Sequence, residues 1–553
     1  MRERGASGKI GGMTQYDCII IGGGHNGLVC AGYLARAGQR VLVLERQGVV
    51  GGAAVTDEIA PGYKVSTASY LVSLLLPEVE RDLELKRHGY RVLARNPSSF
   101  TPLPDGRHLL MGADHALNHA QIAKFSARDA EAYPRYEAWL TRVAECIEPL
   151  LAEPPADLLP LPAQWRRRGF MQQLRELGRG GRLYKAVRAM GSELPQTLEL
   201  ITGAARPILD RWFESDVLKA TLATDAVIGT HAPVSAPGTG YVLLHHVMGT
   251  AGGARGVWGY VEGGMGALTQ AMARSATASG VEIRLNTEVA EVLVEGGKAV
   301  GVRLVGGEKI GARMVASNAT ARVTFEQLLD GAHLPQAFRE AVSRIDYSSA
   351  SMKINLAVSE LPDFSCLPGK AEVGPQHRGT IHISPTMEYL ERAYDDAKYG
   401  HPSREPVLEL TIPTSVDRTL APDGHHIVQM FVQYAPYALA AEIAGGWDAI
   451  GDAFADRCIA AATLYAPNFR ASVLHRQVLT PLDLERRFRL TGGNIFQGAM
   501  PLHQLFSFRP VAGWSDYRTP LPGLYLCGAA AHPGGGVSGA PGWNCAKEML
   551  RDC

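Results

Sequence analysis

The sequence lacks any pair of cysteines at a redox or metal-binding spacing. Its eight cysteines contain no C-x-x-C pair, so we expect reduced thiols of a cytosolic protein, several of them in the core. Two histidine pairs, His245-His246 and His425-His426, are expected on strands, where neighbouring side chains point to opposite faces. We therefore expect neither a redox-active disulfide nor a bound metal.

The chain also has no charge imbalance and no long apolar run. Lys and Arg number 55, as do Asp and Glu, which gives no global preference for nucleic acid. No apolar run approaches the 18 or so residues of a membrane helix, and no secretory segment precedes the first expected strand. We expect a cytoplasmic protein that is soluble or membrane-peripheral. Residues 1–13 are polar and glycine-rich, so we expect disorder there and regard Met13 as a natural start.

What the chain has in abundance is glycine, and the glycines near the N-terminus form a motif. Residues 18–21 are a short apolar run typical of a buried parallel strand. Gly22, Gly24 and Gly27 follow as G-x-G-x-x-G, before a helix expected over residues 28–37. The first glycine allows a tight turn, the second lets the backbone approach a pyrophosphate, and the third allows close packing of helix on sheet. The segment predicts a dinucleotide cradle.

An acid closes this unit. Glu45 follows the second expected strand, residues 41–44, at about the distance expected of a carboxylate that binds a ribose hydroxyl. His25 and Asn26 lie within the glycine turn, where contacts with phosphate or backbone are expected. The helix N-terminus directs free N–H groups and partial positive charge at the phosphates.

The residues after Glu45 bear on whether the cofactor is a flavin or a nicotinamide nucleotide. The segment from Glu45 and Arg46 to Gly51, Gly52 and Ala53 resembles the E-R-x-x-x-x-G-G segment of FAD-dependent enzymes of the glutathione reductase and amine oxidase kinds. This resemblance implies FAD, with the glycine pair near its phosphates and ribityl chain. Residues 62–76 mix small polar and apolar residues, which fits either a lining beside the cofactor or an ordinary buried connection.

The remaining pattern predicts two interleaved domains. The chain is expected to return to the cofactor unit with a helix over about residues 265–279, strands on both sides of Gly296-Gly297 and a strand ending at Asn318. Another sheet is expected from the spaced strands that follow, with a helix over 448–464 among them; these strands cover residues 352–358, 380–384, 407–411, 426–432 and 473–479. We predict an α/β (α+β overall) fold, a split Rossmann-type FAD-binding domain interleaved with a mixed-sheet substrate domain that carries a helical insert. The predicted boundaries are 14–100, 256–330 and 516–553 for the FAD domain, and 101–255 and 331–515 for the substrate domain.

The last cofactor element begins with a buried strand that ends at Gly528. Small residues follow it, including Gly535 and Val537, and leave room for a planar ring. The next helix N-terminus can stabilise negative charge on a reduced flavin. His532 lies on this loop and is our candidate for a catalytic residue that handles a proton or orients the substrate.

These segments resemble a known superfamily. The motifs G-x-G-H-N-G, G-G-A-A-V-T, G-G-N-I-F and L-Y-L-C-G-x-x-x-H-P-G-G-G-V are similar to those of the pyridine nucleotide-disulfide oxidoreductase domain-containing protein 2 family. This family belongs with the FAD-dependent phytoene desaturases, carotenoid isomerases and retinol saturases. The resemblance covers nearly the whole chain and implies that the backbone at Val289 covers the adenine. For a eukaryotic member it implies the mitochondrial matrix.

The predicted function is hydride transfer between an apolar, polyene or long-chain substrate and flavin N5, with oxygen or a quinone as the final acceptor. Two alternatives stay open, an amine oxidase and a flavin-stabilised interaction protein. The residues between Gly528 and Gly542 include no aromatic ring to hold an amine, and no S-G-G-C-Y stretch is present for covalent attachment. We therefore expect non-covalent FAD.

One basic segment is not explained by the cofactor motifs. Residues 165–188 contain Arg and Lys against a single acid, Glu176, with apolar and aromatic residues interleaved. Such a segment is typical of peripheral contact with an anionic membrane, and also of a solvated helix face or a subunit contact.

Overall fold

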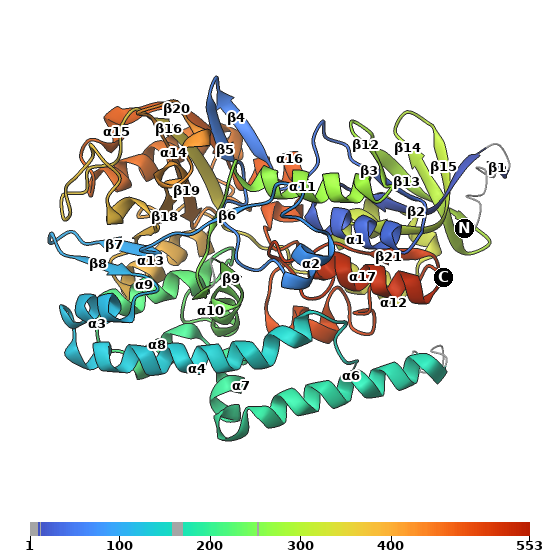
Figure 1. Cartoon of the computed structure of the whole chain (residues 1–553), viewed down its shortest axis with the longest axis horizontal. Coiled ribbons are helices and arrows are strands. Elements are labelled where there is room, and N and C mark those ends of the chain that lie inside the picture. The colour runs from blue at the N-terminus through green and yellow to red at the C-terminus, as the bar shows by residue number, and fades with distance from the viewer. Residues whose placement is uncertain (1–8, 11–12, 158–169, 252–253) are drawn as a thin grey trace.

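The computed structural model describes residues 9–10, 13–157, 170–251 and 254–553 (Figure 1). One sheet carries the glycine motif. It runs in the order β12-β3-β2-β15-β14-β13, with β21 paired to β15 and β1 paired to β2. Its strands are β1 (Lys9–Ile10), β2 (Met13–Ile21), β3 (Val41–Leu44), β12 (Glu282–Arg284), β13 (Val289–Glu295), β14 (Lys298–Leu304), β15 (Lys309–Ser317) and β21 (Leu524–Leu526).

The centre of this first sheet is parallel, as a dinucleotide-binding unit requires. β2 pairs in parallel with β3 and β15, and β21 pairs in parallel with β15, whereas β13, β14 and β15 form an antiparallel meander. Helix α1 (His25–Arg36) packs against α11 (Met265–Ala278) and α17 (Ala540–Arg551). All three predicted cofactor segments therefore meet in one domain.

The second sheet has seven strands, in the order β20-β16-β19-β18-β17-β7-β8. They are β7 (Ser99–Pro102), β8 (His108–Met111), β16 (Met352–Val358), β17 (Thr380–Ile383), β18 (Val407–Thr411), β19 (His426–Gln433) and β20 (Val473–Leu479). Met352 and Ile354 of β16 share an apolar cluster with Trp447 and Phe454 of α14 (Gly446–Thr463). One face of the sheet is thus covered by α14, and the other face remains for the site.

A helical insert lies beside the second sheet. Its elements are α3 (His115–Ala123), α4 (Ala127–Leu151), α6 (Phe170–Ala189), α7 (Leu194–Thr202), α8 (Ala205–Trp212), α9 (Asp216–Val227) and α10 (Thr239–Val247). Ser126 caps α4 by accepting a hydrogen bond from the Asp129 backbone N–H at 3.1 Å. Figure 1 shows α4 and α6 running along one side of the molecule. None of the helices in the described ranges is long and apolar enough to cross a membrane.

Shorter elements connect these layers. They include β4 (Thr56–Ala60), β5 (Tyr63–Ser66), α2 (Pro77–Asp82), β6 (Val92–Leu93), β9 (Thr250–Ala251), β10 (Ala254–Arg255), β11 (Tyr260–Val261), α12 (Gln336–Ser343), α13 (Met387–Lys398), α15 (Phe469–Ser472) and α16 (Pro481–Phe488).

The predicted fold class is confirmed, and three details differ. His245 and His246 lie in helix α10 rather than on a strand, because the apolar residues around them pack among helices. The predicted boundary at residue 100 falls inside β7, which pairs with β17 of the second sheet. Lys9–Ile10, within the segment expected to be disordered, pairs with Met13–Thr14. Residues 1–8 and 11–12 of that segment lie outside the described ranges.

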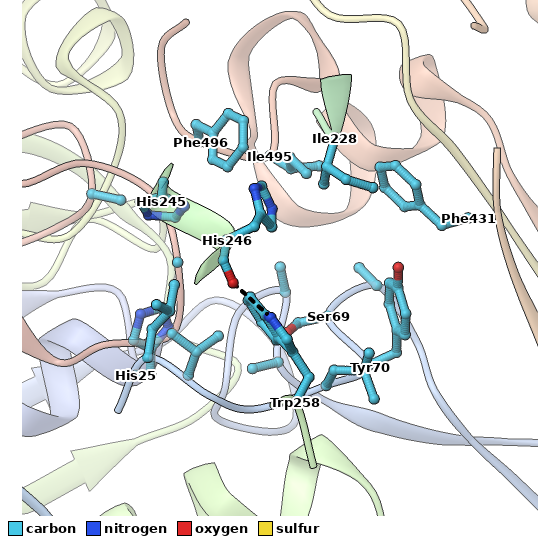
Figure 2. A pocket seen from close by; sticks show the side chains of 18 of the residues that line it. His25, Ser69, Tyr70, Ile228, His245, His246, Trp258, Phe431, Ile495 and Phe496 are labelled. Carbon is cyan, nitrogen blue, oxygen red and sulfur yellow. Dashed lines mark hydrogen bonds between the residues drawn. The ribbon is translucent and has the colours of Figure 1, made fainter. Parts of the chain in front are cut away.

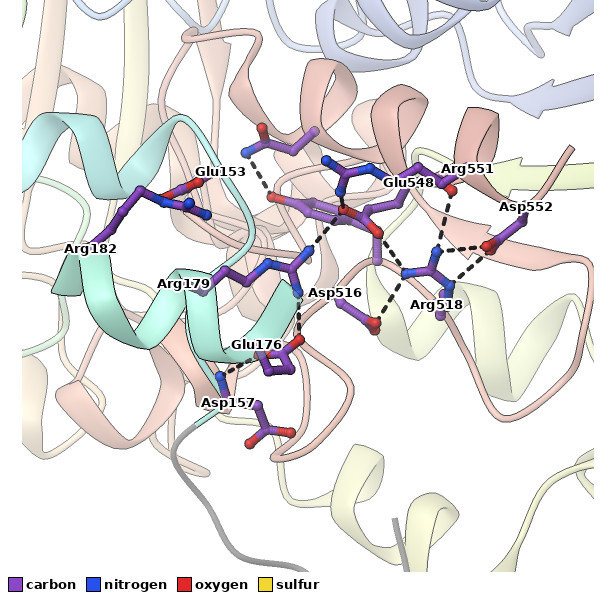
Figure 3. Close-up of polar contacts among 12 residues, drawn as sticks. Glu153, Asp157, Glu176, Arg179, Arg182, Asp516, Arg518, Glu548, Arg551 and Asp552 are labelled. Atoms are coloured by element: carbon purple, nitrogen blue, oxygen red, sulfur yellow. Dashed lines mark hydrogen bonds and ion pairs between the residues drawn. The ribbon is translucent and has the colours of Figure 1, made fainter. Parts of the chain in front are cut away.

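Helix α6 is fixed to the C-terminal helix by buried charges (Figure 3). Arg179 donates from Nη1 to Glu176 at 2.5 Å and from Nη2 to Glu548 of α17 at 2.8 Å, and all three side chains are buried. Arg518 contacts the other oxygen of Glu548 at 2.8 Å. The sole acid of the basic segment therefore faces the protein, while residues 165–169 of that segment lie outside the described ranges.

Candidate functional site

The glycine turn has the close approaches that its sequence predicts. Gly22 adopts φ +93°, a conformation that favours glycine. A Cβ on Gly24 would lie 2.6 Å from Asn318 Nδ2, and a Cβ on Gly27 would lie 2.3 Å from the carbonyl oxygen of Gly22. Helix α1 begins directly after Gly24, at His25. The turn thus leaves backbone N–H groups at a helix N-terminus clear of side chains.

Glu45 is held in place by the backbone. Its Oε2 accepts a hydrogen bond from Gly23 N at 2.8 Å, and its Oε1 accepts one from Gln47 N at 2.8 Å. Each carboxylate oxygen keeps a further lone pair for a ribose hydroxyl. Arg46 instead donates to the carbonyl of Arg487, so its guanidinium links the cradle to α16.

The second glycine pair packs on the first turn. Gly51 donates from its backbone N–H to Gly23 O at 2.9 Å. A Cβ on Gly52 would lie 3.4 Å from the Cα of Gly24, and both Gly51 and Gly52 have positive φ. The next residue, Ala53, accepts a hydrogen bond from Ser69 N at 3.0 Å. The pair therefore forms the second wall of the cradle and connects it to the segment that leads to the other sheet.

The C-terminal loop brings its small residues against the cradle but turns His532 away. His532 is fully buried, donates from Nε2 to the Leu150 carbonyl at 3.2 Å, and does not line the cavity described below. Burial lowers the pKa of His532 to about 4. A Cβ on Gly528 would lie 2.6 Å from the Asn318 carbonyl oxygen, and one on Gly535 would lie 2.3 Å from the Phe496 ring. The catalytic role of His532 stays a prediction, and its contacts favour packing against α4.

One continuous cavity of about 1160 Å³ joins the cradle to the second sheet. It is lined by eleven of the residues predicted to bind cofactor: Gly22, Gly24, His25, Asn26, Glu45, Arg46, Gly51, Gly52, Ala53, Val289 and Val537. Gly27, Gly528 and Gly535 lie behind this lining, where they allow close packing. Burial lowers the pKa of His25 to about 4, against the opposing effect of a hydrogen bond with the Gly536 backbone, so His25 is neutral near pH 7.

Beyond the cradle the cavity is mostly apolar and aromatic (Figure 2). Tyr70 and Phe431 lie 6.1 Å apart with their rings 30° from parallel. Trp258 stacks on His246 at 5.8 Å. Residues 68–71 and Leu74 line the cavity, whereas Tyr63 and Val65 of the same segment are buried in an apolar cluster. The position of residues 68–71 beside the cofactor stays a prediction.

His245 connects the two halves of the cavity. It donates from Nε2 to the Gly535 carbonyl at 3.2 Å, and so ties helix α10 to the C-terminal loop. Burial, with a smaller effect of the neighbouring His246, lowers the pKa of His245 to about 3. Its imidazole is therefore neutral and acts as a hydrogen-bond donor.

Several residues that line the cavity were not identified from the sequence. They are Asn318 in the cradle, and Arg95, Asp225, Lys353, His382 and Glu409 around the other half of the cavity. A signal for three of them exists, because Lys353, His382 and Glu409 each stand between two apolar residues of a buried strand. Such a polar position inside a central strand indicates a face that meets a ligand cavity rather than a core.

The cradle fits FAD. The space left by Gly24 and Gly52 admits a pyrophosphate, Glu45 provides the ribose acceptor, and the cavity continues from there toward the second sheet. A split Rossmann-type sheet with such a cavity at its domain junction defines the class of two-domain FAD-dependent oxidoreductases.

Comparison with known proteins agrees with this class. The family model of flavin-containing amine oxidoreductases matches residues 27–420. The chain is 49% identical to the rat (Rattus norvegicus) pyridine nucleotide-disulfide oxidoreductase domain-containing protein 2, over 100% of this chain and 95% of that protein. It is 25% identical to the phytoene desaturase of Neurospora crassa, over 94% of this chain and 82% of that protein.

Among solved structures, wild-type putrescine oxidase bound to putrescine superposes with a TM-score of 0.59 at 16% identity, over 97% of this chain and 98% of that chain. The chain belongs to the flavin-containing amine oxidoreductase family, and within it to the pyridine nucleotide-disulfide oxidoreductase domain-containing protein 2 group. It is an FAD-dependent oxidoreductase.

Proposed function

We propose that this protein dehydrogenates or isomerises an apolar, polyene or long-chain substrate, with non-covalently held FAD as its cofactor. The observation that carries the proposal is the continuous cavity, whose half beyond the cradle is lined mainly by apolar and aromatic side chains. The distant similarity to a phytoene desaturase supports the same substrate class. When bound, FAD supplies the acceptor for a hydride at flavin N5.

The residues of the chain position the substrate and exclude water. The Phe496, Trp258 and Tyr70 rings surround the space next to the cradle, and a dry, shaped site favours hydride transfer without a strong acid or base. His245 stays neutral and holds the Gly535 carbonyl. We propose oxygen or a membrane quinone as the final electron acceptor.

The test is anaerobic mixing of the purified holoenzyme with a panel of polyenes and long-chain compounds. Bleaching of the visible flavin absorbance, followed by its recovery on addition of oxygen or a quinone, is expected. If no apolar compound bleaches the flavin while simple amines do so and produce peroxide, the proposal is wrong.

That outcome would favour the second candidate, amine oxidation. The stacked Tyr70 and Phe431 rings and the carboxyl groups of Asp225 and Glu409 line the same cavity, and aromatic faces and carboxylates both attract cations. The putrescine oxidase similarity extends only to the fold.

We further propose that α6 makes a peripheral contact with an anionic membrane, from the cytoplasmic side. Leu177 and Tyr184 are 67% and 64% exposed and lie seven positions apart on one helix face. Lys185 and Arg188 are exposed on that face, whereas the helix's acid, Glu176, is buried against Arg179. Apolar side chains bordered by cations suit an anionic lipid surface.

Vesicle flotation tests this contact. Wild-type protein should float with vesicles that contain an anionic lipid, and a Leu177→Glu/Tyr184→Glu variant should not. Leu464→Glu is the matched control, because Leu464 is an exposed leucine (82%) at the end of α14, which lies away from α6 (Figure 1). Wild-type protein that stays fully soluble with anionic vesicles would exclude the membrane contact.

A further inference from the structure

Arg509 is buried behind one wall of the cavity. Its side chain is 3% exposed and is not part of the cavity lining. It donates hydrogen bonds from Nη2 to the Phe496 carbonyl at 2.6 Å and from Nε to the Ala529 carbonyl at 3.0 Å. Phe496 and Ala529 both line the cavity, so the guanidinium lies directly behind the residues that form this wall.

The remaining hydrogen bonds of Arg509 also go to backbone carbonyls. Nη1 donates to Gly498 and Ala499 at 3.3 Å and to Gln504 at 3.4 Å, and Nη2 donates to Gly498 at 3.2 Å. Among the residues that the structure describes, no carboxylate forms a hydrogen bond or an ion pair with Arg509. A carbonyl satisfies a donor but carries no net charge, so the buried positive charge is left without a compensating anion.

The charge of Arg509 persists at neutral pH and acts on side chains at the cavity. Burial lowers the pKa of Arg509 to about 10, which leaves the guanidinium protonated at pH 7. The pKa of His245 is lowered by burial first, then by His246, and also by the charge of Arg509. Because His245 lines the cavity and donates to the Gly535 carbonyl, the field of Arg509 reaches the cavity across the C-terminal loop.

The wall in front of Arg509 stands where the two domains meet. A Cβ on Gly535, in the C-terminal loop, would lie 2.3 Å from the Phe496 ring, and a Cβ on Gly229, in the helical insert, would lie 2.6 Å from it. The same ring meets the His245 ring edge to face at 6.1 Å (Figure 2). This wall therefore lies on the way from the cofactor cradle to the second sheet.

An uncompensated cation behind a cavity favours an anion inside it. The pyrophosphate of FAD is negative in both redox states, and the N-terminus of α1 already faces it at the cradle. The flavin ring becomes negative only on reduction, when uptake of two electrons and one proton leaves the charge on its N1–C2=O region. A charge near the ring therefore changes the relative stability of the two redox states.

We propose that Arg509 stabilises the negative charge of the reduced flavin across the cavity wall and so raises the midpoint potential of the bound FAD. Arg509 is a positioning residue in this role, since it acts through the backbone and the field in front of it and does not itself line the cavity. The inference rests on the FAD-dependent class of the protein and not on the proposed substrate.

The midpoint potential of the purified holoenzyme at pH 7, measured without substrate by stepwise reduction against a reference dye, tests the proposal. Arg509→Met should lower this potential by at least about 30 mV, which corresponds to a tenfold weaker binding of reduced relative to oxidised FAD. Arg509→Lys keeps the charge but lacks the planar set of five donors. It should therefore recover most of the potential without recovering the Tm.

A second pair of variants changes the charge while every hydrogen bond of Arg509 stays in place. The position that a Cβ on Gly498 would take lies 3.5 Å from Arg509 Nη2 and 3.7 Å from Ile345 Cγ2, and Ile345 is half-buried. Ile345→Glu brings a carboxylate within reach of the guanidinium, and Ile345→Gln is its uncharged control. The Glu variant should have a potential at least about 15 mV below that of the Gln variant, a threefold change in relative binding.

The outcomes separate an effect of charge from an effect of packing. An unchanged potential in Arg509→Met would overturn the proposal even if the Kd for FAD rises, because a charge that acts on the pyrophosphate affects both redox states equally. A lowered potential that Arg509→Lys does not restore would overturn it as well, and would assign the effect to the ordered backbone.

If the Arg509 variants do not fold or do not retain FAD, the second pair decides. Equal potentials of Ile345→Glu and Ile345→Gln would then overturn the proposal. Since no substrate enters these measurements, failure of the proposed apolar substrate would leave their result unchanged.

Discussion

Replacing Gly27 by alanine should loosen the cofactor without unfolding the protein. A Cβ at this position would lie 2.3 Å from the Gly22 carbonyl oxygen, 3.2 Å from Asn318 Nδ2 and 3.3 Å from Ile20 Cγ2. The first of these is a backbone atom, so α1 and the glycine turn must separate by about 1 Å to reach an ordinary contact distance. Overpacking of this size costs about 1–3 kcal/mol.

Part of that cost is offset, because alanine favours helix over glycine by up to about 1 kcal/mol. The turn that moves is the one that meets the pyrophosphate, so we expect the remaining strain to appear in FAD binding. A remaining loss of about 1–2 kcal/mol raises the Kd for FAD by roughly 5- to 30-fold. Apoprotein reconstitution, followed by the quenching of FAD fluorescence, measures this Kd directly.

Gly180→Ala is the control for the preference of alanine over glycine in a helix. Gly180 lies inside α6, and a Cβ there would meet nothing within 4 Å. This variant should be slightly more stable than wild type and bind FAD equally well. If Gly27→Ala binds FAD within twofold of wild type, the close approach of α1 to the turn does not support the cofactor and the reasoning fails.

Three further variants test other parts of the structure. Arg179→Met breaks a buried pair with Glu548, which typically costs about 3–5 kcal/mol, so amide hydrogen exchange in α6 should rise by at least about 100-fold; unchanged exchange would mean that α6 is held by other contacts. Lys353→Met should stabilise the fold at pH 7 by about 1–3 kcal/mol, because Lys353 Nζ is buried and no described residue hydrogen bonds to it. Its advantage in urea unfolding should shrink as pH rises toward 10.5, since the lowered pKa in the folded state means that the unfolded wild type binds more protons in that window. His532→Ala should keep FAD bound and alter kcat; an unchanged kcat with a lowered Tm would leave His532 a packing role only.

The cofactor cradle could be predicted from the sequence because its parts are close in the chain. Gly23 and Glu45 are joined by a hydrogen bond across one strand–helix–strand unit, and such a unit has a characteristic spacing. Lys353, His382, Glu409 and Phe431 instead come from four strands of one sheet. They form a row only through the pairing register, which short-range patterns do not specify.

The direction of the His532 side chain could not be predicted, for a different reason. The sequence correctly places its loop at the cofactor domain, after the strand that ends near Gly528. Which way a side chain on that loop points is decided by α4, whose Leu150 carbonyl accepts the His532 hydrogen bond. That helix belongs to an insert far away in the chain, so no local motif could indicate the contact.

Hydrogen bonds connect the substrate half of the cavity to the cofactor half. His245 of the helical insert holds the Gly535 carbonyl beside the cradle, and Ser69, next to the cavity-lining Tyr70, donates to the Ala53 carbonyl beside the second glycine pair. A change on the substrate side can therefore shift backbone that faces the cofactor. It follows that a ligand seated over Lys353 and Glu409 can perturb the flavin spectrum without touching the flavin, because Tyr70 contacts both residues.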